Sequence, residues 1–320
     1  MRSAIQRSQR GAALLTAMII VALVATLASA MVWQQWRAVQ VEAAERGRLQ
    51  SAWLITGALD WARLMLRGHV RAAGPTALNG AWAVPLAEAR LSTFLAADKN
   101  NTDGGPDAFL SGNINDVQAR YNLRGLYDPQ TQKVDPNQLA ALRRLFQTIN
   151  LAPAMADAIA EGLRDAQVPP GTPGAPSAPP LMPEQLDQLV WLGIDEAAVR
   201  QMAPYVVLLP APTPVNVNTA SKEVLAAVLA IGLGDAQRLV QHRQRNAFNS
   251  IAEVEAQLSG PKLSPQAQTL LLVGKSTFFE VRGRLRLDDR VLEESSVLER
   301  RGNDFVTVSR KRESSRESTR

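Results

Sequence analysis

The stretch RGAALLTAMIIVALVATLASAMV, residues 10–32, decides the fold, because a basic leader that ends in glycine directly precedes a long apolar run. The run from Ala12 to Val32 holds no charged residue and is long enough to cross a hydrocarbon core of about 30 Å. A secretory signal carries its cleavage site after the apolar core, which is then discarded. Here the glycine comes first, so cleavage after Gly11 would leave the helix in the mature protein.

The charges beside this run predict its orientation. Three arginines precede the run, namely Arg2, Arg7 and Arg10. The positive-inside rule therefore predicts a cytoplasmic N-terminus and a chain that lies across the membrane from Arg37 onward, with Trp33 and Trp36 in an aromatic belt at the far interface. An uncleaved signal anchor explains the hydrophobicity and the charge asymmetry equally well, and the Gly11–Ala12 junction favours processing.

Apolar residues beyond the membrane segment predict that the helix continues. They recur at spacings of three and four residues, the signature of one helical face: Ala52, Ile55, Leu59, Ala62 and Leu66. A helix from Ala12 to about Leu66 would span on the order of 80 Å at about 1.5 Å per residue, far more than a bilayer requires. Gly68 and Gly74-Pro75 are stop signals. We therefore expect the outer half of this helix to pack against a sheet.

Composition and motifs do not indicate an enzyme. A chain of 320 residues allows two or three domains, and the absence of cysteine excludes thiol catalysis and Cys-ligated zinc. The two histidines, His69 and His242, are interpreted as surface or packing residues, and no H-E-x-x-H, G-x-S-x-G or G-x-x-x-x-G-K motif is present. No catalytic set can be assembled from these residues, so we expect a non-enzymatic protein without a cofactor. A single-span periplasmic enzyme is a further alternative, and it would need a cleft that holds a perturbed carboxylate.

Residues 118–273 are predicted to form an all-helical region. Amphipathic patterns predict helices over residues 136–150, 153–163 and 183–192. Asp135 is placed to cap the first of these helices. Seven prolines lie between residues 169 and 183 and predict an extended, exposed loop.

A helix-hairpin-helix-like unit is predicted over residues 214–260. The stretch VNVNTAS, residues 215–221, precedes a helix that runs through Leu229, and a Gly-x-Gly turn leads into the next helix. The side chains of Asn216 and Asn218 are interpreted as satisfying backbone groups at the turn into the helix. The same combination of stretch and turn resembles DNA-uptake proteins.

Two functions stay open for this unit. Backbone amides of the Gly232–Gly234 turn would grip a phosphate. Basic residues that would neutralise DNA lie nearby: Arg238, His242, Arg243 and Arg245. Against DNA binding, Asp235 brings a negative charge into the turn and residues 251–257 are not basic. We favour a small helical packing module, and a membrane-anchored DNA-binding protein of a DNA-uptake apparatus remains the alternative.

An oxygen-rich stretch from Asp98 to Asp107 follows a short helix predicted over residues 85–97. It fails the EF-hand template, because Asp103 stands where glycine is needed and Phe109 where glutamate is needed. We interpret the stretch as a polar turn rather than a metal site.

Strand periodicity begins after the helical region. Alternating apolar and polar residues predict antiparallel strands over residues 278–287, 291–301 and 305–309. The basic end, residues 310–320, is predicted to be a disordered tail. Because the long helix and these strands lie at opposite ends of the chain, residues 118–273 are interpreted as an inserted domain.

Together these features resemble the minor pseudopilin K family of type II secretion systems, also called general secretion pathway protein K. The resemblance rests on the Gly11 leader, the helical insertion, the stretch ARYNL at residues 119–123, residues 210–221 and the closing strands, in this order. It implies an α+β fold. A pilin-like long N-terminal helix would pack on a small antiparallel sheet, with a large all-helical, SAM-like or helix-hairpin-helix-like domain inserted.

The resemblance divides the chain into six segments. They are a cytoplasmic leader at 1–11, a transmembrane segment at 12–36, the rest of the helix and the start of the head at 37–117, the insertion at 118–273, closing strands at 274–309 and the tail at 310–320.

The resemblance also implies how the N-terminus is processed. In this family a prepilin peptidase cuts after a glycine and commonly methylates the new N-terminus, which implies cleavage between Gly11 and Ala12 and methylation of Ala12. Most such proteins carry glutamate at the fifth mature position, thought to offset the free amine of a neighbouring subunit, and Thr16 stands there in this chain. The Thr16 hydroxyl needs no such partner, because it can bond back to a carbonyl one turn earlier.

The implied function is that of a non-enzymatic subunit at the tip of a periplasmic pseudopilus, which helps to initiate its assembly and to export folded proteins across the outer membrane. Implied partners are the minor pseudopilins I and J, the pseudopilus and the prepilin peptidase, and nucleic acid is not expected. The chain would cross the inner membrane once, with a periplasmic head. Relatives with a calcium site tend to carry an acidic loop after the helix that here ends near Glu161–Asp165, and the proline-rich stretch in its place removes calcium from the expected ligands.

Overall fold

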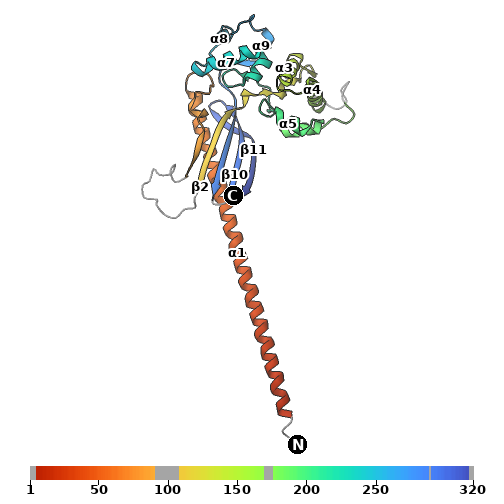
Figure 1. Cartoon of the computed structure of the whole chain (residues 1–320), viewed down its shortest axis with the longest axis vertical. Coiled ribbons are helices and arrows are strands. Elements are labelled where there is room, and N and C mark those ends of the chain that lie inside the picture. The colour runs from red at the N-terminus through yellow and green to blue at the C-terminus, as the bar shows by residue number, and fades with distance from the viewer. Residues whose placement is uncertain (1–4, 91–107, 169–175, 288–289, 317–320) are drawn as a thin grey trace, which may run out of the picture. The chain divides into compact units, whose positions relative to one another are not determined.

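The computed structural model describes the backbone of residues 5–90, 108–168, 176–287 and 290–316, and the side chains in these ranges other than those of residues 5–11 and 316 (Figure 1). The chain forms two compact units, residues 1–56 and 57–320. Helix α1, Ile5–Arg71, runs through the boundary between them. The domain boundaries that the sequence predicts stay predictions.

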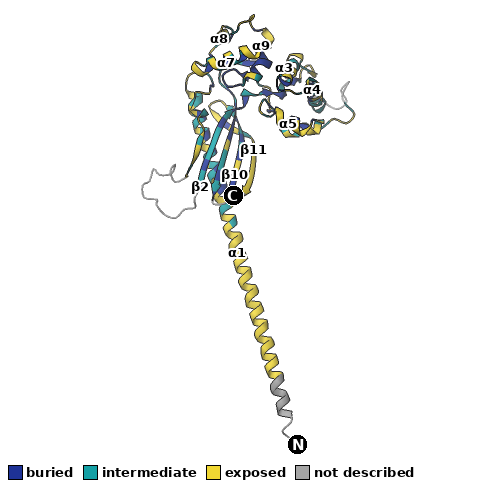
Figure 2. Ribbon diagram, in the orientation of Figure 1, coloured by how far each residue is buried: buried dark blue, intermediate teal, exposed yellow. Residues whose placement is uncertain are grey.

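The first unit consists of helix α1 as far as Thr56. Every side chain from Ala12 to Ala43 is exposed, which Figure 2 shows in yellow. A helix satisfies its own backbone hydrogen bonds, so it is one of the few structures that can lie in lipid with an apolar surface on all sides. The exposed apolar surface of this helix therefore fits a location in lipid.

A five-stranded antiparallel sheet forms one part of the second unit, in the order β1-β2-β9-β10-β11. Its strands are β1 Leu86–Arg90, β2 Ala108–Asp116, β9 Phe278–Leu287, β10 Arg290–Arg301 and β11 Asp304–Arg316. The first two strands precede the helical region and the last three follow it. The helical region is therefore inserted between β2 and β9, which lie side by side in the sheet.

Two sequence predictions in the sheet are wrong. A helix was predicted over residues 85–97, but Leu86–Arg90 form strand β1, and residues 91–97 lie outside the described residues. The stretch LAEAR consists of good helix formers, and its pairing with β2 overrides that local propensity. The disordered tail predicted from residue 310 is likewise wrong as far as residue 316, because β11 pairs with β10 along its whole length.

The end of helix α1 packs on this sheet, as the apolar spacing predicts. Leu59, Ala62 and Leu66 are buried in one apolar cluster with residues of the sheet and its first loop: Trp82, Ile114, Phe279, Val281, Leu298 and Phe305. The helix ends at Arg71, before Gly74, whose φ of 94° suits glycine. The expected α+β arrangement of a long helix on an antiparallel sheet is confirmed.

The insertion has its own apolar core, which extends from Tyr121 to Leu271. Its helices are α3 Pro136–Thr148, α4 Pro153–Gln167, the 3-10 helix η4 Leu186–Leu192, α5 Glu196–Met202, α6 Lys222–Leu229, α7 Leu233–Arg245, α8 Ile251–Glu255 and α9 Pro265–Thr269. Short 3-10 turns lie at Ala81–Ala83, Val117–Ala119 and Leu123–Leu126. Two-residue strands form three further pairs, namely β3 Tyr121–Asn122 with β6 Val206–Val207, β4 Tyr127–Asp128 with β5 Lys133–Val134, and β7 Val215–Asn216 with β8 Leu271–Leu272.

Local sequence explains the helices of the insertion. The carboxylate of Asp135 accepts hydrogen bonds from the backbone amides of Asn137 and Gln138, which confirms the predicted N-cap of α3. The helix predicted over residues 183–192 is a 3-10 helix instead. A Cβ on Gly162 would lie 2.9 Å from Leu192 Cδ1, so glycine allows η4 to approach α4 closely.

Candidate functional site

Within the part of the chain that the structure describes, α1 is the one helix long and apolar enough to cross a membrane. Its large side chains between residues 14 and 32 are exposed, and they include Leu14, Leu15, Met18, Ile19, Ile20, Leu23 and Leu27. At the end of this run the guanidinium of Arg37 lies over the ring of Trp33, 5.6 Å from its centre. A paired tryptophan and arginine suits the boundary between hydrocarbon and head groups.

Thr16 stands in this apolar run. Its Oγ1 donates to the carbonyl oxygens of Ala12 at 2.8 Å and Ala13 at 3.1 Å, as the sequence predicts. The hydroxyl is thereby satisfied inside its own helix and makes no demand on a neighbouring subunit. The backbone at Gly11 is helical, and cleavage between Gly11 and Ala12 stays a prediction.

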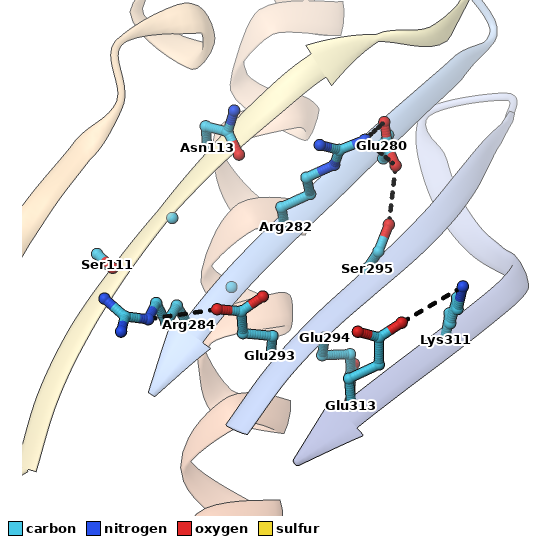
Figure 3. Close-up of a pocket in the computed structure, with 12 residues that line it drawn as sticks. Ser111, Asn113, Glu280, Arg282, Arg284, Glu293, Glu294, Ser295, Lys311 and Glu313 are labelled. Carbon is cyan, nitrogen blue, oxygen red and sulfur yellow. Dashed lines mark hydrogen bonds and ion pairs between the residues drawn. The ribbon is translucent and has the colours of Figure 1, made fainter. Parts of the chain in front are cut away.

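The outer face of the sheet, turned away from α1, holds a hollow of about 470 Å³ (Figure 3). Glu280 lies at its edge, where it accepts from Ser295 Oγ at 2.8 Å and contacts Arg282 Nη2 at 3.1 Å. Further along, Arg284 pairs with Glu293 at 3.3 Å and Lys311 with Glu313 at 3.3 Å. Acidic and basic side chains thus alternate across β9, β10 and β11.

Burial alone would raise the pKa of Glu280, but the positive charges of Arg120 and Arg282 outweigh it and lower that pKa. The carboxylate is therefore held ionised. The residues that line the hollow include neither histidine nor cysteine. This surface therefore presents positive and negative side chains in alternation.

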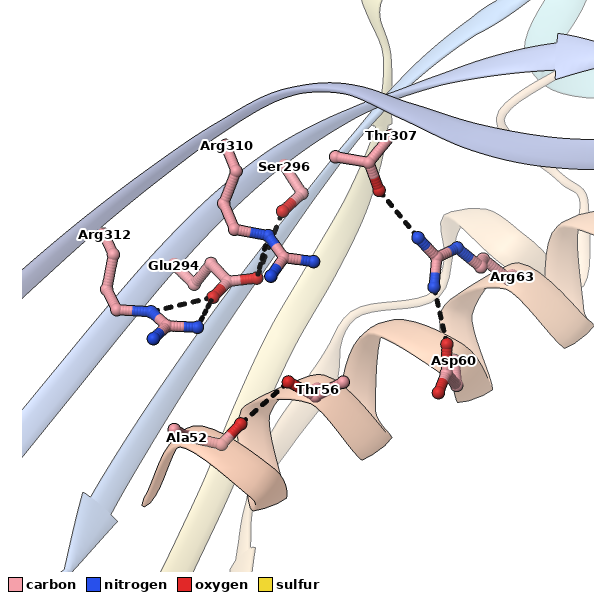
Figure 4. A network of polar contacts seen from close by, with 9 residues as sticks. All are labelled: Ala52, Thr56, Asp60, Arg63, Glu294, Ser296, Thr307, Arg310 and Arg312. Atoms are coloured by element: carbon pink, nitrogen blue, oxygen red, sulfur yellow. Dashed lines mark hydrogen bonds and ion pairs between the residues drawn. The ribbon is translucent and has the colours of Figure 1, made fainter. Parts of the chain in front are cut away.

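The inner face of the sheet buries a second carboxylate, Glu294 (Figure 4). Its side chain is only 3% exposed and accepts from Arg312 Nε at 3.0 Å and Nη2 at 2.6 Å. Arg310 Nε lies 3.2 Å away on the other oxygen, and Ser296 Oγ donates at 3.1 Å. Two arginines from the predicted tail thus neutralise this buried charge.

A further contact ties strand β11 to helix α1. Arg63 donates to Thr307 Oγ1 at 2.6 Å and pairs with Asp60 on its own helix at 2.6 Å (Figure 4). The sequence analysis missed Arg310, Arg312 and Glu294. One signal was available, because a tail with Arg310 and Arg312 two residues apart continues the alternation of the preceding strand.

Both histidines are packing residues, as predicted. His69 lies between Trp82 and Phe279, with ring centres 5.7 and 6.2 Å away, and its Nε2 is 2.9 Å from Thr76 Oγ1. Burial, with the charges of Lys275 and Arg300, lowers the pKa of His69. The ring of His242 stacks on Phe248 at 4.8 Å.

Two basic residues of the helix-hairpin-helix-like unit, Arg238 and Arg243, are engaged within the protein. Arg243 is buried and donates to the carbonyl oxygens of Val217 at 2.7 Å and Thr219 at 3.5 Å, and burial lowers its pKa to about 10. Arg238 contacts Asp235 and Ser259. The residues expected to neutralise DNA therefore include two that hold the unit together instead, which favours the packing module.

Asn216 and Asn218 both satisfy backbone groups, but only the Asn216 bond lies at the predicted turn into the helix. Asn218 binds both backbone groups of Phe248, with its oxygen 2.8 Å from the amide and its nitrogen 2.9 Å from the carbonyl. Asn216 Oδ1 accepts from the Asn218 amide at 2.9 Å. Among the described residues no three histidine or acidic side chains are grouped to hold a metal ion, and Asp98–Asp107 lie outside the described residues.

These features define a class of protein. A pilin-like subunit consists of a helix with a membrane-length apolar run whose end packs on an antiparallel sheet. The helical insertion between β2 and β9 distinguishes this chain from a pilin-like subunit without an inserted domain.

Comparison with known proteins names the family. Two models described as "Type II secretion system (T2SS), protein K" match, one at residues 119–211 and one at residues 215–274. Type II secretion system protein K of Pseudomonas aeruginosa is 29% identical over 95% of this chain and 92% of its own length. The Klebsiella pneumoniae protein of that name is 27% identical over 95% of this chain and 96% of its own length.

A solved structure has the same fold. It is a chain of the GspK-GspI-GspJ complex of the type 2 secretion system of enterotoxigenic Escherichia coli, matched with a TM-score of 0.63 at 18% identity, over 85% of this chain and 99% of that chain. The chain is thus a relative of type II secretion system protein K, and the sequence prediction of a minor pseudopilin of type II secretion is confirmed. The DNA-uptake alternative finds no support in these matches.

Proposed function

We propose that this chain is a non-enzymatic subunit at the tip of a periplasmic pseudopilus, where it helps to initiate assembly of the filament and export of folded proteins. The observation that carries the proposal is the helical insertion between β2 and β9. A filament repeats one contact between identical subunits. A subunit with a second domain built into its sheet is suited to end such a series, because each further copy would have to accommodate another insertion.

The proposed partners are the minor pseudopilins I and J. A protein of the same fold is part of the GspK-GspI-GspJ complex of enterotoxigenic Escherichia coli. In the membrane we propose contact between helices through small residues, which let backbones approach closely: Ala12, Ala13, Ala17, Ala22, Ala25, Ala28 and Ser29. In the second unit, the exposed side chains of Trp61 and Leu64 on α1 offer apolar surface to a neighbouring helix.

The proposed location is the inner membrane, crossed once, with the N-terminus in the cytoplasm and the head in the periplasm. The positive charges before Gly11 support this orientation. We further propose cleavage by a prepilin peptidase between Gly11 and Ala12, with methylation of Ala12. Thr16, with its hydroxyl bonded inside the helix, would let this subunit insert without an acidic partner for a neighbour's amine.

Two measurements test these proposals. The mass of the protein from membranes of cells with the prepilin peptidase should correspond to a chain that starts at Ala12, and without the peptidase to an intact leader. An intact leader in both strains would contradict processing. A strain that lacks the chain should lose secretion of its exported proteins and regain it from a plasmid copy. Unaltered secretion in the deletion strain would contradict the proposed function.

A further inference from the structure

One buried carboxylate lies where the insertion joins the sheet. Asp116 is the last residue of β2, is 5% exposed, and accepts four hydrogen bonds. Its Oδ1 accepts from the Gln118 amide at 2.9 Å. Its Oδ2 accepts from Asn216 Nδ2 at 2.8 Å, Thr219 Oγ1 at 2.6 Å and Ser276 Oγ at 2.7 Å.

These donors come from parts of the chain that are far apart in sequence. Gln118 lies where the insertion begins, Asn216 and Thr219 lie in its middle, and Ser276 lies where it ends. The loop after α1 joins the same network through Thr76. The Thr76 carbonyl accepts from Asn216 Nδ2 at 2.9 Å, and Thr76 Oγ1 accepts from the Ser276 amide at 3.0 Å.

The donors to Asp116 are all neutral. Burial raises the pKa of Asp116, and the bonds from Thr219, Ser276 and Asn216 only partly offset this. An ionised carboxylate without a cation in hydrogen-bond contact is costly to bury, and apolar side chains could hold the same segments together at less cost. What a carboxylate adds is direction, since each donor must point at one of its two oxygens.

We propose that Asp116 is the positioning residue of the helical insertion. Its carboxylate fixes the orientation of residues 118–273 at the end of the sheet, and so sets where the insertion presents itself to neighbouring subunits. The orientation of the insertion on the sheet is a property of this chain alone. Its presentation to neighbouring subunits rests on the proposed function. Other contacts between sheet and insertion carry less direction. They include the ion pairs Arg120–Glu280 at 3.2 Å and Lys311–Asp187 at 4.0 Å, and an apolar cluster in which Leu209 packs with Phe278.

The chain has no cysteine, which makes a distance measurement direct. Spin labels on cysteines at exposed Ser309 of β11 and Gln266 of α9 report the distance between sheet and insertion in the full chain in detergent micelles. Labels at Gln147 of α3 and Gln266 report distances within the insertion. In Asp116→Ala we expect the Ser309–Gln266 distribution to broaden about twofold and the Gln147–Gln266 distribution to stay unchanged.

The matched control is Leu145→Ala, which removes a fully buried side chain from the core of the insertion. It should lower the melting temperature and leave the Ser309–Gln266 distribution narrow. A narrow distribution in Asp116→Ala together with a lowered melting temperature would overturn the proposal, because Asp116 would then only stabilise.

If Asp116→Ala does not fold, Thr219→Val and Ser276→Ala each remove one donor and should broaden the same distribution. An unchanged width in both would overturn the proposal. The conservative variant Asp116→Asn keeps an oxygen acceptor and should recover part of the narrow width. Secretion is measured separately, so failure of the unmodified chain to restore it would contradict the proposed function and leave the distance result standing.

Discussion

Two buried carboxylates of the second unit are held in opposite ways. Glu294, on the inner face of β10, has two arginines and a serine around it. Asp116, at the end of β2, has only neutral donors. The first arrangement neutralises a charge inside the sheet, and the second uses a charge to collect donors from distant segments. A buried acid can therefore stabilise the fold through its ion pairs, or it can orient distant segments through directed hydrogen bonds.

The largest expected effect comes from removing both cations of Glu294. The double variant Arg310→Met, Arg312→Met leaves the carboxylate buried without a positive partner, with Ser296 as its remaining donor. It should lower the free energy of unfolding by about 3 kcal/mol, the low end of the range because both arginines are partly exposed. Urea unfolding of the full chain in micelles, followed by circular dichroism, measures it. Adding Glu294→Leu should recover most of the loss, and no recovery would show that the arginines act through packing.

A single donor to Asp116 should matter less. Thr219→Val removes the 2.6 Å bond to Oδ2 and should cost about 2 kcal/mol of unfolding free energy, since a bond to a charged group is lost. Thr148→Val is the matched control, because its hydroxyl only bonds back to the Arg144 carbonyl in α3. Equal losses in the two variants, by the same urea unfolding, would remove any special role for the carboxylate.

Glu280 is intermediate, since it has both a serine and two arginines around it. Its pKa is lowered from 4.5 in the folded state, so it stabilises fully above pH 4.5 and less as the pH falls through the folded value. Glu280→Gln should therefore cost about 1 kcal/mol at neutral pH, and the difference should vanish in acid.

Asp116 should show the opposite sign. Its pKa is raised from 3.8, so ionisation opposes folding, and the unmodified chain should lose stability relative to Asp116→Asn as the pH rises through the folded value. Urea unfolding at a series of pH values tests both carboxylates. The stability of the unmodified chain relative to each variant should change with pH in opposite directions for Glu280 and Asp116. A change in the same direction would contradict the contrast between the two carboxylates.

The smallest effect is expected where a carboxylate is exposed. Glu313 pairs with Lys311 across 3.3 Å, but both side chains are more than half exposed. Glu313→Gln should change the free energy of unfolding by less than about 0.5 kcal/mol. A loss as large as that of Thr219→Val would mean that burial does not determine how much a carboxylate of this protein contributes to the free energy of unfolding.

Much of the fold follows from local sequence. The apolar run and the spacing of Leu59, Ala62 and Leu66 predict a helix that packs on a sheet, and strand β9 was predicted with its observed bounds. The Thr16 bond could be predicted because donor and acceptor lie one turn apart. Strand β1 could not, because LAEAR favours a helix until β2 lies beside it.

The sequence by itself determined the membrane-length helix, the cap at Asp135 and the bounds of strand β9, since each depends on groups within a few residues of one another. Only the tertiary structure decided that residues 310–316 complete the sheet and that Asp116 meets Asn216, Thr219 and Ser276. The physical reason is distance along the chain. Such contacts exist only after strands have paired and loops have closed, and no local pattern records which distant donor a buried carboxylate will find.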